Sequence, residues 1–480
     1  MSHQNAVLSS MALFTLLCPL GAYAGSSSGS VDLPRELPQN SASTSTYQST
    51  AQDSDSSSAP HTGFVGLESS SFLYQAKDRG NSSTTFEGEW NGSFHGNSFQ
   101  GKANAQIYSF VGDHPEIGFE SKELYISTTP KLMSNLGEIS IGRRYVEWSK
   151  VDKAWDMMSL WSPRWTWDPL HPETIGMTGI FYTYDRGGFH FTAFGSPLAI
   201  PERGTSTFEK DGNIVSNSPL WNQLPDEMNV MGVQTKIHYS LMTPPMNEIL
   251  FRPNFALKAL YQFDSGAWLS AGLGVLPVHI IQMAAEPYLD SSTTGDLNVN
   301  VRPQFPLRNI YTAEAGYQPG KDWNVWFSTS YEQPFQFENE STWLNPIITP
   351  TSIVSAGTSV QVTSNFRFIG SALFIHEQPF VSSSTLKGVD VELPTRFPVK
   401  QGFKIGGNWR FDDQTQSRFS WTQDLIEQNH FVSLDVQHAL RKASLIIGGG
   451  ADLFFNNTTH GWVGQYYGDD RLRGWLKYVF

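Results

Sequence analysis

The chain has 480 residues, and its 32 Lys and Arg against 45 Asp and Glu give a net charge of −13 that argues against non-specific nucleic-acid binding. Charged residues make up only 16% and aromatic residues 13%, whereas an average soluble domain carries about 25% charged residues. Few charges, many aromatics and 41 Gly fit a large all-β structure with short strands better than a soluble enzyme.

Residues 1–24 have the pattern of a secretory signal peptide. An apolar stretch over 6–20 precedes Ala22-Tyr23-Ala24, a small-residue cleavage site, so we expect cleavage after Ala24. The segment departs from the usual pattern because it has no Lys or Arg at its start. Cys18, the only cysteine of the chain, lies inside it. The mature chain would therefore form neither a disulfide nor a thiolate metal site.

The next segment, residues 25–60, is rich in Ser, Thr, Gln and Pro and has almost nothing to bury. We expect a disordered linker there, acting as a spacer rather than as a binding segment. From residue 61 the composition changes, and residues 61–480 are predicted to form one domain.

This domain is built from segments of about ten residues in which apolar and polar positions alternate. Examples are "TTFEGEWNGSF", "DWNVWFSTSYE" and "GFKIGGNWRF". Such segments, separated by turns, are typical of a transmembrane β-barrel. A soluble β-sandwich also alternates, but here the apolar positions begin and end with Phe, Tyr or Trp, as expected at two water–lipid boundaries. In lipid the sheet has to close, because unpaired backbone groups are too costly there.

Turn signals divide the domain into about 18 strands, with 16 and 20 as alternatives. Short turns are expected near residues 95–97, 185–187, 263–265, 319–321, 412–413 and 441–442, and long connections near 150–176, 199–227, 282–304, 336–351, 381–399 and 457–470. Counting from the two ends of the domain gives results that differ by one strand between 199 and 251. The predicted fold is thus a closed antiparallel β-barrel whose strand assignment is uncertain in that one region.

The last strand, "RLRGWLKYVF", carries the clearest motif. One face has Leu472, Leu476, Tyr478 and the terminal Phe480, while the other has mainly cationic and polar residues. This pattern resembles the terminal strand of Gram-negative outer-membrane β-barrel proteins, and the layout of the domain resembles a porin. The resemblance implies that these four residues form a signal that is read by the barrel-assembly machinery. It also implies a location in the outer membrane, contact with its lipid and lipopolysaccharide, and a homotrimer as one assembly.

The most unusual stretch is "EWSKVDKAWDMMSLWSPRWTWDPLHPET", residues 147–174, in a connection predicted to be extracellular. One interpretation is that it folds into the barrel and narrows the pore, so that Trp rings stack on sugars or cations and charged residues select solutes. The other is a packed lid or a set of aromatic residues at the outer rim. The candidate constriction residues are Trp155, Asp156, Trp161, Arg164, Trp165, Trp167 and Asp168.

Charged residues on the polar faces of the strands are predicted to line the lumen, where they would tune ion selectivity. Most such residues are simply solvated wall positions. The predicted wall residues are Glu87, Glu89, Lys102, Arg144, Lys404, Arg410, Arg418, Arg473 and Lys477.

Signals for catalysis are weak. The chain has neither an H-E-x-x-H nor a G-x-S-x-G motif, and its 12 His lack metal-ligand spacing. Acids in the predicted outer loops are better explained as solvated side chains than as Ca²⁺ ligands. We therefore expect no catalytic residues, no metal and no cofactor.

The sequence predicts an outer-membrane, porin-like channel for passive diffusion of small hydrophilic solutes such as sugars, without nucleic-acid partners. A barrel of 16–18 strands is wide enough for an aqueous channel. Two alternatives remain at this point. One is a structural or adhesive surface barrel plugged by its loops, and the other is an outer-membrane hydrolase.

Overall fold

The computed structural model of the protein describes residues 62–73, 82–111, 115–133, 136–155, 158–216, 226–230, 233–242, 249–280, 282–289, 296–335, 349–377, 397–440, 444–456 and 468–480, and the single positions 218, 220, 224, 244, 463, 464 and 466. The predicted signal segment 1–24 and the predicted linker 25–60 lie outside these residues. None of the described helices is long and apolar enough to cross a membrane.

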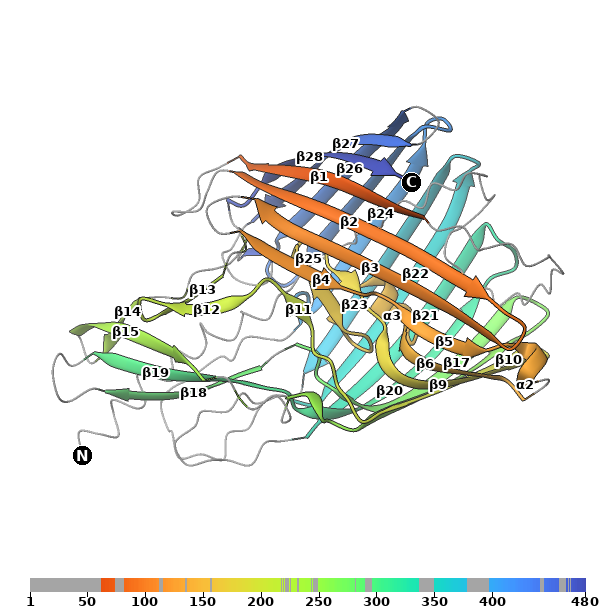
Figure 1. The fold of residues 1–480 in the computed structure, drawn as a ribbon, viewed down its shortest axis with the longest axis horizontal. Coiled ribbons are helices and arrows are strands. Elements are labelled where there is room, and N and C mark those ends of the chain that lie inside the picture. The colour runs from red at the N-terminus through yellow and green to blue at the C-terminus, as the bar shows by residue number, and fades with distance from the viewer. Residues whose placement is uncertain are drawn as a thin grey trace.

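The described chain forms a closed antiparallel β-barrel (Figure 1). β4 and β5 both pair with β3, one with each half of it, so they occupy one position in the wall. The nineteen strands of this sheet therefore fill eighteen positions, and β1 pairs with β28 to close the barrel. The barrel strands are β1 (Thr62–Phe72), β2 (Ser82–His95), β3 (Phe99–Val111), β4 (Glu116–Glu120), β5 (Leu124–Thr128), β6 (Glu138–Arg144), β9 (Met177–Arg186), β10 (Phe189–Ser196), β16 (Asn254–Gln262), β17 (Ala267–Pro277), β20 (Leu307–Tyr317), β21 (Trp323–Pro334), β22 (Thr351–Thr363), β23 (Phe366–Glu377), β24 (Gln401–Arg410), β25 (Thr415–Asp424), β26 (His430–Leu440), β27 (Leu445–Phe455) and β28 (Arg471–Val479).

The two ends of the barrel differ in the length of their connections. Tight turns join β9 to β10 and β16 to β17, and Gly187, Gly188 and Gly266 adopt the positive φ angles that these turns need. Both termini of the barrel lie at this short-turn end, where Gly63 and Phe480 exchange backbone hydrogen bonds of 3.0 and 2.9 Å. One connection at this end is longer and contains the short helix α2 (Pro130–Met133). The prediction of a closed antiparallel barrel with about 18 strands is confirmed.

The two faces of each barrel strand differ as the alternation predicted. On β28, Leu476 and Tyr478 are 47% and 52% exposed on the outside, whereas Arg471 and Arg473 are 4% and 5% exposed on the inside. Phe480 follows on the outer face, with 53% exposure. A continuous outer surface of exposed aliphatic and aromatic side chains is stable against lipid and not against water. The outer face is therefore the lipid face.

The strand missing from one of the two sequence counts does not belong to the barrel. β10 pairs directly with β16, so the described strands between them, in the connection 197–253, lie outside the wall. Its strands combine with those of the connection 278–306, which the sequence had suggested was a plain long loop, into a separate four-stranded sheet in the order β14-β15-β19-β18. This sheet projects from one side of the barrel, on the left of Figure 1. The outer strands are β12 (Thr207–Lys210), β13 (Asn213–Ser216), β14 (Glu227–Val230), β15 (Val233–Leu241), β18 (Gln282–Leu289) and β19 (Leu297–Gln304).

This outer sheet has a small apolar core of its own. Ile237 and Tyr239 of β15 and Val299 and Val301 of β19 are 1–3% exposed and belong to one buried cluster. β15 and β19 pair in parallel although they come from different connections. The sheet is therefore held together by tertiary packing between two loops, which the local alternation of either loop does not reveal.

Candidate functional site: a passage beside an inserted segment

Residues 145–176, between β6 and β9, fold into the barrel and are called the inserted segment below. They contain α3 (Lys150–Ala154), β7 (Arg164–Thr166) and β8 (Glu173–Thr174). Ser149 caps α3, because its Oγ accepts the Val151 N–H at 3.1 Å. The same hydroxyl donates to Glu314 of β20 at 3.0 Å. The start of the helix is thus attached to the inner face of β20, inside the barrel.

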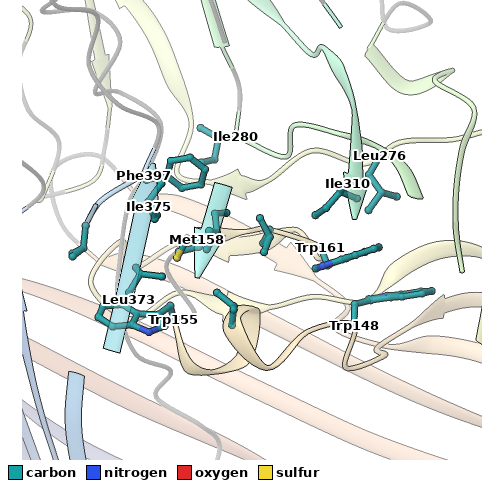
Figure 2. Packing of buried hydrophobic residues seen from close by; sticks show 14 of the residues in the cluster. Trp148, Trp155, Met158, Trp161, Leu276, Ile280, Ile310, Leu373, Ile375 and Phe397 are labelled. Atoms are coloured by element: carbon teal, nitrogen blue, oxygen red, sulfur yellow. The ribbon is translucent and has the colours of Figure 1, made fainter. Parts of the chain in front are cut away.

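One side of the inserted segment is apolar and packs against the barrel wall (Figure 2). Trp155 and Trp161 have no exposed surface, and Trp148 is 2% exposed. The rings of Trp148 and Trp161 stack with centroids 5.4 Å apart. The wall residues in this cluster come from strands around much of the circumference: Met177, Phe181, Phe194, Ala256, Trp268, Leu276, Ile310, Trp326, Ile353, Leu373, Ile375, Phe431 and Phe454.

Buried polar groups fix the same side in place. Arg308 of β20 donates to the carbonyl oxygens of Leu160 at 2.5 Å and Ser159 at 3.2 Å, and pairs with Glu332 at 2.7 Å. Arg308 is 1% exposed and Glu332 is fully buried. Within the segment, Asp152 accepts the Leu160 N–H at 2.8 Å. These bonds satisfy the backbone of a non-helical turn that would otherwise be buried unpaired.

Two titratable groups from neighbouring connections border this cluster. Burial lowers the pKa of His279 to about 3, and its Nε2 lies 2.9 Å from the Trp161 carbonyl oxygen. His279 is therefore neutral and donates from Nε2. Burial raises the pKa of Glu202 to about 8, and the attraction of Arg164 offsets this only in part. Near neutral pH the cluster therefore holds a mostly protonated Glu202.

A second aromatic cluster joins the inserted segment to β3 and β4. The rings of Trp165 and Trp167 stack at 5.8 Å, and Trp167 stacks on Phe110 at 4.7 Å. Gly118 of β4 makes this packing feasible, because a Cβ at that position would lie 2.5 Å from the Trp167 ring. These indoles are 3% and 4% exposed, so they act as packing residues along most of their surface.

The remaining side of the segment is held by ion pairs to β27 and β28. Asp168 pairs with Arg471 at 2.5 Å, and His171 lies 2.9 Å from Asp452. Asp452 also accepts from Arg471 at 2.7 Å and lies 3.0 Å from Nε of Arg473. The segment is thus packed by apolar contacts on one side and attached by charged side chains on the other.

A cavity of about 60 Å³ lies on this charged side, between the tip of the inserted segment and β28, β1, β2 and β3. This volume holds a few water molecules. Burial opposes ionisation of Asp168, but Arg471 and His171 outweigh it and hold the pKa of Asp168 below its usual value. The cavity is lined by Glu68, Ser70, Ser83, Thr85, Glu87, Tyr108, Phe110, Trp167, Asp168, Pro169, Ser218, Leu220, Arg471 and Arg473.

The predicted constriction residues therefore lie in different surroundings. Trp155 and Trp161 are enclosed in the apolar cluster, and Arg164, 2% exposed, pairs with Asp152 at 3.2 Å. Trp167 and Asp168 border the cavity. Trp165 stacks behind Trp167, and Asp156 lies outside the described residues.

The predicted wall residues face the interior, and most have charged or polar partners. Lys477 pairs with Glu87 at 2.7 Å, and Lys102 with Glu123 at 2.5 Å. Arg144 pairs with Glu138 at 2.7 Å, and Arg473 with Asp435 at 2.7 Å. The amide of Gln106 donates to Glu89 at 2.8 Å. On β24 and β25, Lys404 and Arg418 are half-buried and Arg410 is exposed.

Sequence reasoning missed several interior residues. Glu68 lines the cavity, Asp452 collects three cationic or imidazole partners, and Glu314 holds the start of α3. Each is a single acidic residue at an inward position of a strand. Alternation can show that such a residue faces the interior, but it cannot show which side chains it contacts. In the described residues, no group of three or more His, Cys, Asp or Glu is arranged to hold a metal ion.

The chain matches no protein-family model and no curated protein. Among solved structures it is similar to OmpF of Salmonella typhi in complex with daunomycin, with 11% identity over 88% of this chain and 97% of that chain and a TM-score of 0.41. A mutant of Rh. blastica porin gives 7% identity over 88% and 99%, with a TM-score of 0.36. OmpT of Vibrio cholerae, expressed in the outer membrane, gives 9% over 89% and 99%, with a TM-score of 0.41. Values this low leave function undecided, and the barrel architecture rests on the strand pairing described above.

Proposed function

We propose that the protein is a porin-like outer-membrane channel for passive diffusion of small hydrophilic solutes, with no enzymatic activity. The observation that carries the proposal is the eighteen-position closed barrel with a lipid-facing outside and a charged inside. A barrel of this size encloses an aqueous space unless loops fill it. Burying charged side chains in an interior without water would destabilise the fold. Their presence on the inner face therefore favours a water-filled lumen.

The proposed passage runs along the charged side of the inserted segment. The apolar side offers no route, because Trp155, Trp161 and Ile310 have no exposed surface. The charged side has the cavity between Trp167, Asp168 and the wall. With room for only a few waters in this cavity, the passage would conduct weakly and admit only small solutes.

We further propose that the solute is a sugar. Trp167, Tyr108 and Phe110 bring aromatic rings to the cavity lining, and Ser70, Ser83 and Thr85 bring hydroxyl groups. Sugars present both apolar C–H faces and hydroxyl edges, so such a mixed lining suits them. The role proposed for Trp161 moves to the part of the Trp167 ring that borders the cavity, because the Trp161 side chain has no exposed surface.

The proposal includes export and assembly. Residues 1–24 would be removed as a signal peptide, residues 25–60 would act as a linker, and the β28 pattern ending in Phe480 would be read by the barrel-assembly machinery of a Gram-negative bacterium. Outer-membrane lipid and lipopolysaccharide would surround the apolar wall, and the protein would assemble as a homotrimer.

A barrel plugged by its own segment is the second candidate. The observation in its favour is that the inserted segment packs against wall residues from β9 round to β27. Such a protein would be structural or adhesive, and its outer sheet would be the surface presented to partners.

Single-channel recording of the refolded full chain in a planar lipid bilayer tests the proposal. Small, steady current steps are expected, and a sugar that occupies the cavity should block them in a concentration-dependent way. The Trp167→Ala variant should lose the block, whereas Trp409→Ala, on the outer face at 51% exposure, should keep it. Folded, inserted protein without current steps would refute the channel and favour the plugged barrel.

A further inference from the structure

We infer that the passage prefers cations, and that Glu68 is the residue that sets this preference. The inference rests on the proposed channel function and adds the charge class of the solute. It starts from the charges beside the cavity, where Glu68, Glu87 and Asp168 face Arg471 and Arg473.

The cationic side chains at this place are neutralised by other acids. Arg471 lies between Asp168 and Asp452, at 2.5 and 2.7 Å. Arg473 lies between Asp452 and Asp435, at 3.0 and 2.7 Å. Each guanidinium therefore has two carboxylate partners, which leaves little of its positive charge for a passing anion.

The third cation is also paired, since Lys477 lies 2.7 Å from Glu87. The acids of this group outnumber its permanent cations: Glu68, Glu87, Asp168, Asp435 and Asp452 face Arg471, Arg473 and Lys477. Five acids against three cations leave a formal charge of −2. A passage with net negative charge raises the local concentration of cations.

Glu68 supplies the part of this charge that is not held in an ion pair. It lies on the inner face of β1, between the outward Leu67 and Ser69, and lines the cavity. Among the described side chains, no ion pair to Glu68 is formed, whereas Glu87 and Asp168 each have one. Its carboxylate is therefore the one on the cavity wall best placed to attract a passing cation.

The size of the effect follows from Coulomb's law. A unit charge about 4 Å from a passing ion in water is worth about 1 kcal/mol, or about a fivefold change in relative permeability. Salt screens this attraction, so the measurement belongs at low ionic strength.

The test is the zero-current potential of the refolded full chain across a KCl gradient in a planar bilayer. The wild-type channel should be more permeable to K⁺ than to Cl⁻. Glu68→Gln should bring the ratio about fivefold closer to one, and Glu68→Lys should make the channel prefer Cl⁻. Glu138→Gln is the matched control, because Glu138 pairs with Arg144 on β6 and does not line the cavity; it should leave the ratio unchanged.

The two proposals fail in different ways. Current steps with a wild-type preference for Cl⁻, or with a ratio that Glu68→Gln leaves unchanged, would overturn the inference and leave the channel standing. Folded wild-type protein without any current would refute the channel and the inference together. Circular dichroism in the same detergent should show that both Glu68 variants keep the strand content of the wild type.

Discussion

Replacing Trp161 by Ala should release the inserted segment from the barrel wall. The Trp161 side chain is fully buried, stacks on Trp148, and donates from Nε1 to Thr312 of β20 at 3.2 Å. Its ring also lies 3.4 Å from the position of a Cβ on Gly272 of β17, so it fills the space between two wall strands and the segment.

The expected cost is set by the loss of a fully buried indole. Trp→Ala changes in a packed interior cost about 3–5 kcal/mol, which includes the lost stacking. Thr312 adds little to this, because its hydroxyl keeps a 2.8 Å hydrogen bond to Ser330. We therefore expect the docking of the segment to weaken by about 4 kcal/mol, which is close to a thousandfold increase in the undocked population.

Trypsin cleavage after Arg164 measures that population. Arg164 is 2% exposed, so the bond is cut only when the segment opens, and the rate follows the open fraction when reclosing is fast. Trp161→Ala should speed this cleavage by two to three orders of magnitude. Mass spectrometry of the fragments measures the rate. Trp409→Ala, on the outer face, should leave it unchanged. An acceleration below about tenfold, equal to about 1.4 kcal/mol, would refute the view that Trp161 anchors the segment.

Two further predictions concern buried charges. The pKa of Glu202 is raised from 4.5 to about 8, so the folded state keeps a proton that the unfolded state loses in this pH range. The free energy of unfolding should therefore fall as pH rises from about 4.5 to about 8, by at most about 5 kcal/mol. Glu202→Gln should flatten this dependence in denaturant unfolding at several pH values, and an unchanged slope would contradict it. Arg308→Met should cost about 3–5 kcal/mol by leaving Glu332 buried without its partner, and the double variant with Glu332→Gln should recover most of the loss.

The barrel was predictable from the sequence because lipid imposes a repeated local rule. On the outer face of a wall strand every second residue is apolar: the rule holds over the 9 residues of β28, and Trp323, Val325, Phe327 and Tyr331 follow it on β21. The turns between such strands are short and carry Gly or Asp, so each boundary has its own signal. Fold, strand number and the faces of the terminal strand follow from this rule without any knowledge of tertiary contacts.

The interior followed no such rule. Asp168 and Arg471 are 303 positions apart in the chain, and His171 and Asp452 are 281 apart, yet each pair is in contact. Alternation assigned Arg471 to the cationic, polar face of the last strand and the Trp-rich stretch to a loop, but it did not single out Asp452 and gave no register between loop and wall. The sequence therefore indicated which residues face the lumen, while the identity of their partners required the fold.

The one error in strand counting has the same cause. The connections 197–253 and 278–306 do contain strands, but β14 and β13 have only 4 residues each, and β15 pairs in parallel with β19 across about sixty positions of sequence. A strand in lipid needs about nine residues and an antiparallel neighbour next to it in the chain. The length of 4 residues excludes β13 and β14 from the wall, and the parallel pairing of β15 with β19 is incompatible with the antiparallel order of the barrel. The same argument explains the inserted segment: its three Trp with 2% exposure or less follow no alternating pattern. They are buried because they share one apolar cluster with thirteen wall residues from β9 to β27.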